Sequence, residues 1–171
     1  MRAWFGAGVI VVLMGAGATS AAVAPTVKTA SSDALGAKIV VDGAGRTLYR
    51  FTLDRGKSIS CSNACARIWP PVIVPRGAKP VAGSGIARAR LGTVARPDGR
   101  LQLTYAGLPL YRFAQDRSAG AVKGQGLGGN WFAVGASGRL VKTVPAPAGS
   151  GGATTPTPTT PDPTDPPSYG Y

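Results

Sequence analysis

The sequence predicts a mainly β fold: two homologous antiparallel β-meander repeats that share one core, followed by a disordered Pro/Thr-rich C-terminal tail. Three observations lead to this fold class. A Leu-Tyr-Arg-Phe-x-x-Asp-Arg motif occurs twice, short apolar or alternating runs are separated by Gly-containing turns, and the end of the chain is dominated by Pro, Thr and Gly. Short runs bounded by turn residues are typical of antiparallel hairpins. Only 61–68 is compatible with a short helical turn.

The repeat is defined by a constant spacing. Tyr49 and Tyr111 are 62 positions apart, and the same offset relates Asp54 to Asp116 and Trp69 to Trp131. Such an offset predicts two homologous units, each about half of a marginal domain, so that neither is stable alone. The repeated residues that we expect to be structural are Tyr49, Phe51, Asp54, Trp69, Tyr111, Phe113, Asp116 and Trp131.

The elements follow in order from the turn signals. Repeat one covers about 35–75 and repeat two about 91–143, and both lie within a β domain at 35–143. In repeat one we expect strands at 38–41, 47–53 and 69–74. In repeat two we expect them at 91–95, 100–105, 109–113, 131–134 and 139–143. The Gly-rich segment 76–90 is predicted to be a flexible connection.

Strand geometry assigns the faces of the motif, because successive side chains alternate. Tyr49, Phe51 and Leu53 therefore share one face, which is expected to enter the core between the repeats. Leu48 and Arg50 share the other face, with Asp54 at its end. Trp69 and Trp131 are expected to fill the core, the alternative being that they stack on a ligand.

The two ends of the chain are predicted to lie outside the domain. Residues 1–22 have the short positive start, apolar centre and small-residue end of a secretory signal peptide. The alternative is an uncleaved membrane anchor; after cleavage no later segment is apolar enough to span a membrane. Residues 23–34 are predicted to be a disordered linker. Residues 144–171 are predicted to be a disordered tail, since they contain too few large apolar residues to offset ordering entropy.

Composition restricts the chemistry. The chain has 19 Lys and Arg against 7 acidic residues, all of them Asp, and it contains no His and no Glu. His-based acid–base catalysis and the common zinc sites cannot be assembled from such a set. We therefore expect no enzyme activity, no catalytic residue, no metal site and no cofactor. The charge favours an anionic cell-envelope polymer or an envelope protein as partner, but no motif indicates specific nucleic-acid binding.

The motif carboxylates have arginines on both sides. Asp54 lies between Arg50 and Arg55, and Asp116 lies between Arg112 and Arg117. The simplest interpretation is an Arg–Asp pair that fixes each strand end. The four arginines, Arg50, Arg55, Arg112 and Arg117, are also the candidate anion-binding residues.

Cys61 and Cys65 are the two cysteines of the chain. In an exported protein, a pair this close is most simply a structural disulfide. The alternative is a redox-active pair, although a Cys-x-x-x-Cys arrangement lacks the spacing and helix setting that lower a thiol pKa.

Four segments of the chain resemble a bacterial family, the secreted repeat of unknown function. Its members are also described as predicted lipoproteins with a Tyr-x-aromatic-x-x-Asp motif. The resemblance rests on 45–54, 61–71, 124–126 and 130–134 and covers about 35–143. It implies a secreted or extracytoplasmic envelope location in a bacterium and no assigned activity. Many relatives carry a lipobox cysteine, which is absent here. Relatives also tend to have Pro-Gly-Asp where this chain has Ala119-Gly120-Ala121.

Taken together, the sequence predicts a secreted or cell-envelope, non-enzymatic β-repeat module that binds an anionic or wall-associated partner. The alternative function is an extracytoplasmic redox or electron-transfer accessory that uses Cys61 and Cys65. The sequence does not indicate an oligomeric state.

Overall fold

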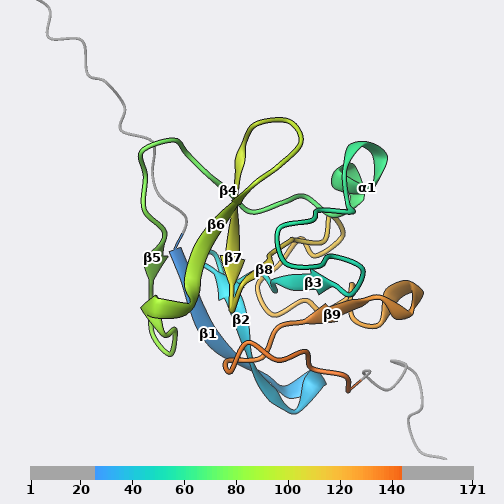
Figure 1. Cartoon of the computed structure of the whole chain (residues 1–171). Coiled ribbons are helices and arrows are strands. Elements are labelled where there is room, and N and C mark those ends of the chain that lie inside the picture. The colour runs from blue at the N-terminus through green and yellow to red at the C-terminus, as the bar shows by residue number, and fades with distance from the viewer. Residues whose placement is uncertain (1–25, 144–171) are drawn as a thin grey trace, which may run out of the picture.

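The computed structural model describes residues 26–143, and these form a mainly β domain (Figure 1). The signal peptide predicted at 1–22 and the tail predicted at 144–171 lie outside the described residues. The strands are β1 (Thr26–Ser32), β2 (Ala37–Asp42), β3 (Tyr49–Phe51), β4 (Ile73–Val74), β5 (Val81–Ala82), β6 (Leu91–Ala95), β7 (Leu101–Tyr105), β8 (Leu108–Pro109) and β9 (Trp131–Ala133). The helices are α1 (Asn63–Ile68) and three single 3₁₀ turns, η1 (Asp33–Leu35), η2 (Arg88–Arg90) and η3 (Leu127–Gly129).

Each repeat begins with an antiparallel hairpin. In repeat two, β6 and β7 pair from Leu91 with Tyr105 to Ala95 with Leu101, close to the predicted strands. In repeat one, β1 pairs with β2 from Val27 with Asp42 to Ser32 with Ala37. The prediction of a disordered linker at 23–34 is therefore wrong for 26–34. The segment has few apolar residues, but Val27 is fully buried, and pairing with β2 provides hydrogen-bond partners for the backbone of β1.

The repeats exchange strands, so two of the three sheets contain strands from both repeats. β9 of repeat two pairs with β3 of repeat one, and β4 of repeat one pairs with β7 of repeat two (Figure 1). At the centre, the backbone N–H groups of Tyr49 and Tyr111 each donate to the carbonyl of the other, at 2.8 and 3.0 Å. Because these tyrosines are equivalent in the two repeats, this bridge lies at the centre of an approximate internal twofold arrangement.

The shared core consists of two clusters, and both draw residues from both repeats. Tyr49 belongs to the cluster with Trp69, Tyr111 and Trp131, whereas Leu48 belongs to the one with Leu103 and Leu110. Successive side chains of β3 and its flank thus alternate as predicted, but both faces are buried: one packs in each cluster. Leu53 departs from the prediction: it is 51% exposed, because β3 ends at Phe51 and the chain turns away.

The connection at 76–90 is held to the fold by backbone hydrogen bonds, contrary to the prediction of a flexible segment. β5 pairs with β1 in parallel, while the other strand pairs of the domain are antiparallel. Gly83 N–H donates to the Val27 carbonyl at 2.7 Å, and Thr29 N–H donates to the Ser84 carbonyl at 2.9 Å. A side chain at Gly83 would meet Lys28 and the Val27 carbonyl at 3.0 Å, which explains a glycine there. Within 26–143, no helix reaches the length and apolarity that a membrane span requires.

Candidate functional site

Four aromatic rings form a continuous stack between the repeats. Trp69 and Trp131 lie parallel, with centroids 3.8 Å apart and an interplanar angle of 2°. Phe51 stacks on Trp131 at 4.4 Å, and its counterpart Phe113 packs on Trp69 at 4.5 Å. Both indoles are about 95% buried. The tryptophans therefore fill the core, as predicted, and present no platform for a ligand.

The motif carboxylates bind tyrosines of the opposite repeat. The Tyr49 hydroxyl donates to Asp116 Oδ2 and the Tyr111 hydroxyl donates to Asp54 Oδ2, both at 2.6 Å. Each second carboxylate oxygen accepts a backbone N–H, from Lys123 for Asp116 and from Ser60 for Asp54. The predicted Arg–Asp pairs are wrong, because both carboxylates are buried and, within residues 26–143, no ion pair joins either of them to an arginine.

These tyrosines and carboxylates are structural groups. Burial, reinforced by the carboxylate that each hydroxyl contacts, raises the pKa of Tyr49 and of Tyr111 far above the ordinary value. Burial also raises the pKa of Asp116, although the Tyr49 hydrogen bond opposes the shift. The tyrosines therefore stay protonated donors across the physiological range, and the pairs join the repeats rather than exchange protons.

The candidate anion-binding arginines fall into two groups. Arg112 Nε donates to buried Asp42 at 2.7 Å, and Arg50 donates to the Gly138 carbonyl at 2.6 Å. Both are thus engaged within the fold. Arg55 and Arg117, by contrast, are exposed. The pKa of Asp42 would rise with burial alone, but hydrogen bonds from Arg112 and the Arg46 backbone, with the charges of both arginines, hold it below its usual value.

Cys61 and Cys65 form the predicted disulfide, with Cα atoms 5.3 Å apart. Cys61 is fully buried and precedes α1, while Cys65 lies within the helix. The bond therefore fastens the start of α1 to the core. No geometric feature of this pair supports the redox alternative.

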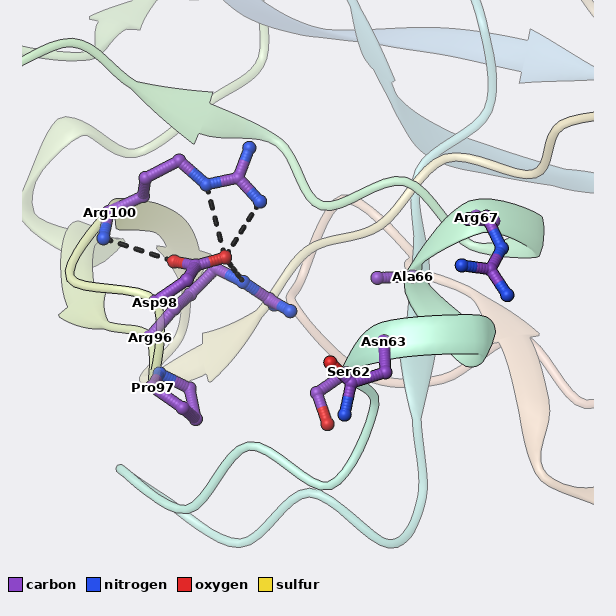
Figure 2. A pocket seen from close by; sticks show the side chains of 8 residues that line it. All are labelled: Ser62, Asn63, Ala66, Arg67, Arg96, Pro97, Asp98 and Arg100. Carbon is purple, nitrogen blue, oxygen red and sulfur yellow. Dashed lines mark hydrogen bonds and ion pairs between the residues drawn. The ribbon is translucent and has the colours of Figure 1, made fainter.

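A pocket of about 450 Å³ lies between α1 and the turn that joins β6 to β7 (Figure 2). The α1 side contributes Ser62, Asn63, Ala66 and Arg67, and the turn contributes Arg96, Pro97, Asp98 and Arg100. Arg100 contacts the Asp98 carboxylate at 2.7 and 3.1 Å, and these contacts lower the pKa of Asp98 to about 2. The lining thus carries three guanidinium groups and one carboxylate.

Arg96 differs from the other arginines of the pocket because it is only 4% exposed. Its Nη2 donates to the Cys61 carbonyl at 2.9 Å, and its Nη1 donates to Gln102 Oε1. Gln102 in turn donates to the Leu110 carbonyl at 2.8 Å. The Nε–H has no hydrogen-bond acceptor, its nearest anion being Asp98 Oδ2 at 3.6 Å.

Comparison with known proteins decides the family. The family model described as a secreted repeat of unknown function matches residues 29–73 and 92–135, more than half of the chain. The chain belongs to this family. As a member of the secreted repeat family, it is a secreted protein. The two matched segments contain most of each hairpin and both copies of the motif, so the family pattern covers the same two units as the internal repeat. No curated protein and no solved structure matches the chain.

The pocket of this secreted repeat protein was not predicted from the sequence. The sequence predicts a turn at Pro97-Asp98-Gly99 between the strands at 91–95 and 100–105, and the arginines at its two ends, Arg96 and Arg100, were the one available signal. Their position beside α1 depends on packing between segments about 35 residues apart, as in the contact from Arg96 to Cys61. Among residues 26–143, no three His, Cys, Asp or Glu side chains gather as metal ligands. The lining of the pocket has a net positive charge.

Proposed function

We propose that this secreted repeat protein is a non-enzymatic module of the bacterial cell envelope that binds an anionic partner. The partner is an envelope polymer, or an envelope protein with an acidic surface. The observation that carries the proposal is the way the fold distributes charge between interior and surface.

Carboxylates are largely placed inside and cations outside. Three of the five acidic residues at 26–143, Asp42, Asp54 and Asp116, are buried, which leaves Asp33 and Asp98 at the surface. The exposed basic residues are Lys38, Arg55, Lys57, Arg67, Arg76, Lys79, Arg88, Arg90, Arg100, Arg117, Lys123, Arg139 and Lys142. The exterior is therefore strongly positive, and a field of this sign concentrates anionic partners near the molecule.

The absence of catalysis is supported by how the polar groups of the core are used. Asp54 and Asp116 each accept a tyrosine hydroxyl and a backbone N–H, which satisfies both oxygens. Neither carboxylate accepts a hydrogen bond from a serine hydroxyl or a cysteine thiol, and the Ser60 hydroxyl beside Asp54 donates to the Leu53 carbonyl instead. The repeated polar residues of the motif are thus accounted for by folding.

Binding of the purified mature chain to anionic polymers tests the proposal. We expect the protein to bind soluble poly(glycerol phosphate) and vesicles containing phosphatidylglycerol, and not vesicles of phosphatidylcholine alone. Affinity should fall steeply as sodium chloride rises from 50 to about 500 mM, because salt screens exposed charges. If no anionic polymer or vesicle bound even at low salt, an anionic partner would be excluded.

A further inference from the structure

Two features break the internal twofold arrangement, and both lie at the same pocket. Repeat one contributes the disulfide Cys61–Cys65 and α1, while the corresponding part of repeat two has a 3₁₀ turn and no cysteine. Repeat two contributes buried Arg96 and Gln102. The residues that distinguish the repeats therefore meet where α1 approaches the β6–β7 turn (Figure 2).

Backbone hydrogen bonds identify the residue of repeat one that is equivalent to Gln102 of repeat two. Val40 N–H donates to the Val134 carbonyl and Leu103 N–H donates to the Val72 carbonyl, at 2.7 and 2.8 Å. Since Val72 and Val134 are equivalent, Val40 corresponds to Leu103, and Ile39 corresponds to Gln102. Ile39 is a buried core residue, 1% exposed. Repeat two thus has a buried amide, hydrogen-bonded to a buried guanidinium, where repeat one is apolar.

A buried guanidinium is costly unless its charge and donors are matched. Arg96 has neutral partners in Gln102 and the Cys61 carbonyl. Asp98, the one carboxylate in the pocket, makes its close contacts with Arg100 at 2.7 and 3.1 Å. Arg96 therefore shares Asp98 with Arg100, at 3.6 Å from its Nε, and this Nε–H has no hydrogen-bond acceptor. With three guanidinium groups against one carboxylate, the pocket as a whole has a surplus of two positive charges.

We propose that this pocket binds a phosphate group, with Arg96 fixed as its rigid donor and Arg67 and Arg100 as mobile donors at the rim. The inference rests on the proposed function and names its binding site and ligand chemistry. Donors stand on two opposite walls: Ser62, Asn63 and Arg67 on one, Arg96 and Arg100 on the other. Phosphate has oxygens in several directions and can contact both walls, whereas a planar carboxylate presents two oxygens to one arginine fork.

The disulfide supports this site directly. It fixes the Cys61 carbonyl, which orients Arg96, and it anchors α1, which carries the opposite wall. The two walls are thereby held at a set separation without a ligand. Such preorganisation lowers the ordering cost of binding.

Binding to inorganic phosphate, poly(glycerol phosphate) and phosphatidylglycerol vesicles would test the site, with polyglutamate as the carboxylate comparison. Ionic strength is kept constant with chloride. Arg67→Gln removes one rim charge, and Arg88→Gln is its matched control, because Arg88 is exposed in η2 and outside the pocket. Ala66→Phe fills the pocket from α1 without changing the net charge. Near-UV circular dichroism verifies that each variant is folded.

We expect Arg67→Gln and Ala66→Phe each to weaken phosphate-polymer binding about tenfold, and Arg88→Gln less than about twofold. Inorganic phosphate should displace the polymer from the wild-type protein at constant ionic strength. The free-polymer and vesicle arms distinguish a soluble polymer from a lipid headgroup as the source of the phosphate.

Other outcomes overturn the inference in distinguishable ways. If Arg67→Gln and Arg88→Gln weaken binding equally and Ala66→Phe has no effect, the pocket is not the site, while the proposed function stands. If polyglutamate binds more tightly than the phosphate polymer, and Ala66→Phe weakens that binding, the ligand of the pocket is a carboxylate and not a phosphate. If the wild-type protein binds none of the anions, the proposed function fails, and this site fails with it.

Discussion

Removal of the Tyr111 hydroxyl should destabilise the domain more than an ordinary lost hydrogen bond. In Tyr111→Phe, Asp54 Oδ2 loses the donor that lies 2.6 Å away. Asp54 is only 5% exposed, so water cannot replace the lost donor without opening the core. Hydrogen bonds to charged groups contribute about 1.5–3 kcal/mol, and we expect a loss of about 2 kcal/mol. For a domain of this size that corresponds to a fall in Tm of roughly 6–10 °C.

Tyr49→Phe is the twofold-related change and should cost slightly more. The Tyr49 hydroxyl donates to Asp116 and also accepts Gly124 N–H at 3.3 Å, so a second polar group loses its partner. The double variant should depart from additivity, because Tyr49 and Tyr111 are in direct backbone contact and belong to one core cluster. Tyr105→Phe is the matched control: its hydroxyl donates to the neutral Ala136 carbonyl at 2.7 Å, and its loss should cost about 1 kcal/mol.

Urea unfolding at pH 7 measures these differences, and an alkaline series adds a specific signature. Because the pKa of Tyr49 and Tyr111 is raised in the folded protein, their contribution is complete below about pH 10, the unfolded value, and is lost as pH rises above it. The double Phe variant should lack that alkaline loss. The reasoning is refuted if Tyr111→Phe costs no more than Tyr105→Phe, or if Arg55→Gln destabilises the domain as much as Tyr111→Phe does.

Three further predictions concern other parts of the core. Asp42→Asn should lower the free energy of unfolding by about 2 kcal/mol at pH 7. Because folding lowers the pKa of Asp42, this advantage of the wild-type protein should be lost as pH falls below about 4. Urea unfolding at a series of acidic pH values measures the loss. Trp69→Phe and Trp131→Phe should each abolish the exciton signal of the parallel indoles in far-UV circular dichroism; an unchanged signal in either would contradict the stack. The double Ser variant of Cys61 and Cys65 should lose about 2 kcal/mol. The reduction potential of the bond should lie below about −300 mV, and a value near −200 mV would favour the redox alternative.

The repeat, the strands and the aromatic core could be predicted because they depend on local patterns. The offset of 62 identifies equivalent residues without any knowledge of pairing, and alternation along 48–51 distinguishes the faces of β3. The turn at 97–99 limits where β6 and β7 can begin and end. The internal symmetry then requires that Phe51 and Phe113 occupy equivalent places, as they do on either side of the stacked indoles.

Partners distant in sequence could not be predicted in this way. Tyr49 and Asp116 are 67 residues apart, and nothing local indicates that each carboxylate would bind the tyrosine of the other repeat. On charge alone, the sequence favours pairing each aspartate with an adjacent arginine. Burial favours the tyrosine instead, because its hydroxyl provides a hydrogen bond to the carboxylate in the core without a second charge that must be desolvated. The strand β1 was missed for a related reason, because its stability comes from β2 rather than from its own apolar residues.

The internal symmetry separates residues that build the fold from residues that could recognise a partner. Tyr49, Asp54, Trp69 and their equivalents each require their counterpart in the other repeat, so a change in one copy would leave a buried group unmatched. The positions around Arg96 are under no such constraint, since Ile39 fills the equivalent of Gln102 with an apolar side chain. Retaining a buried guanidinium there costs stability that the symmetric core does not need to lose. An anionic ligand that neutralises the surplus positive charge of the pocket would offset that cost on binding, which is why recognition is expected where the two repeats differ.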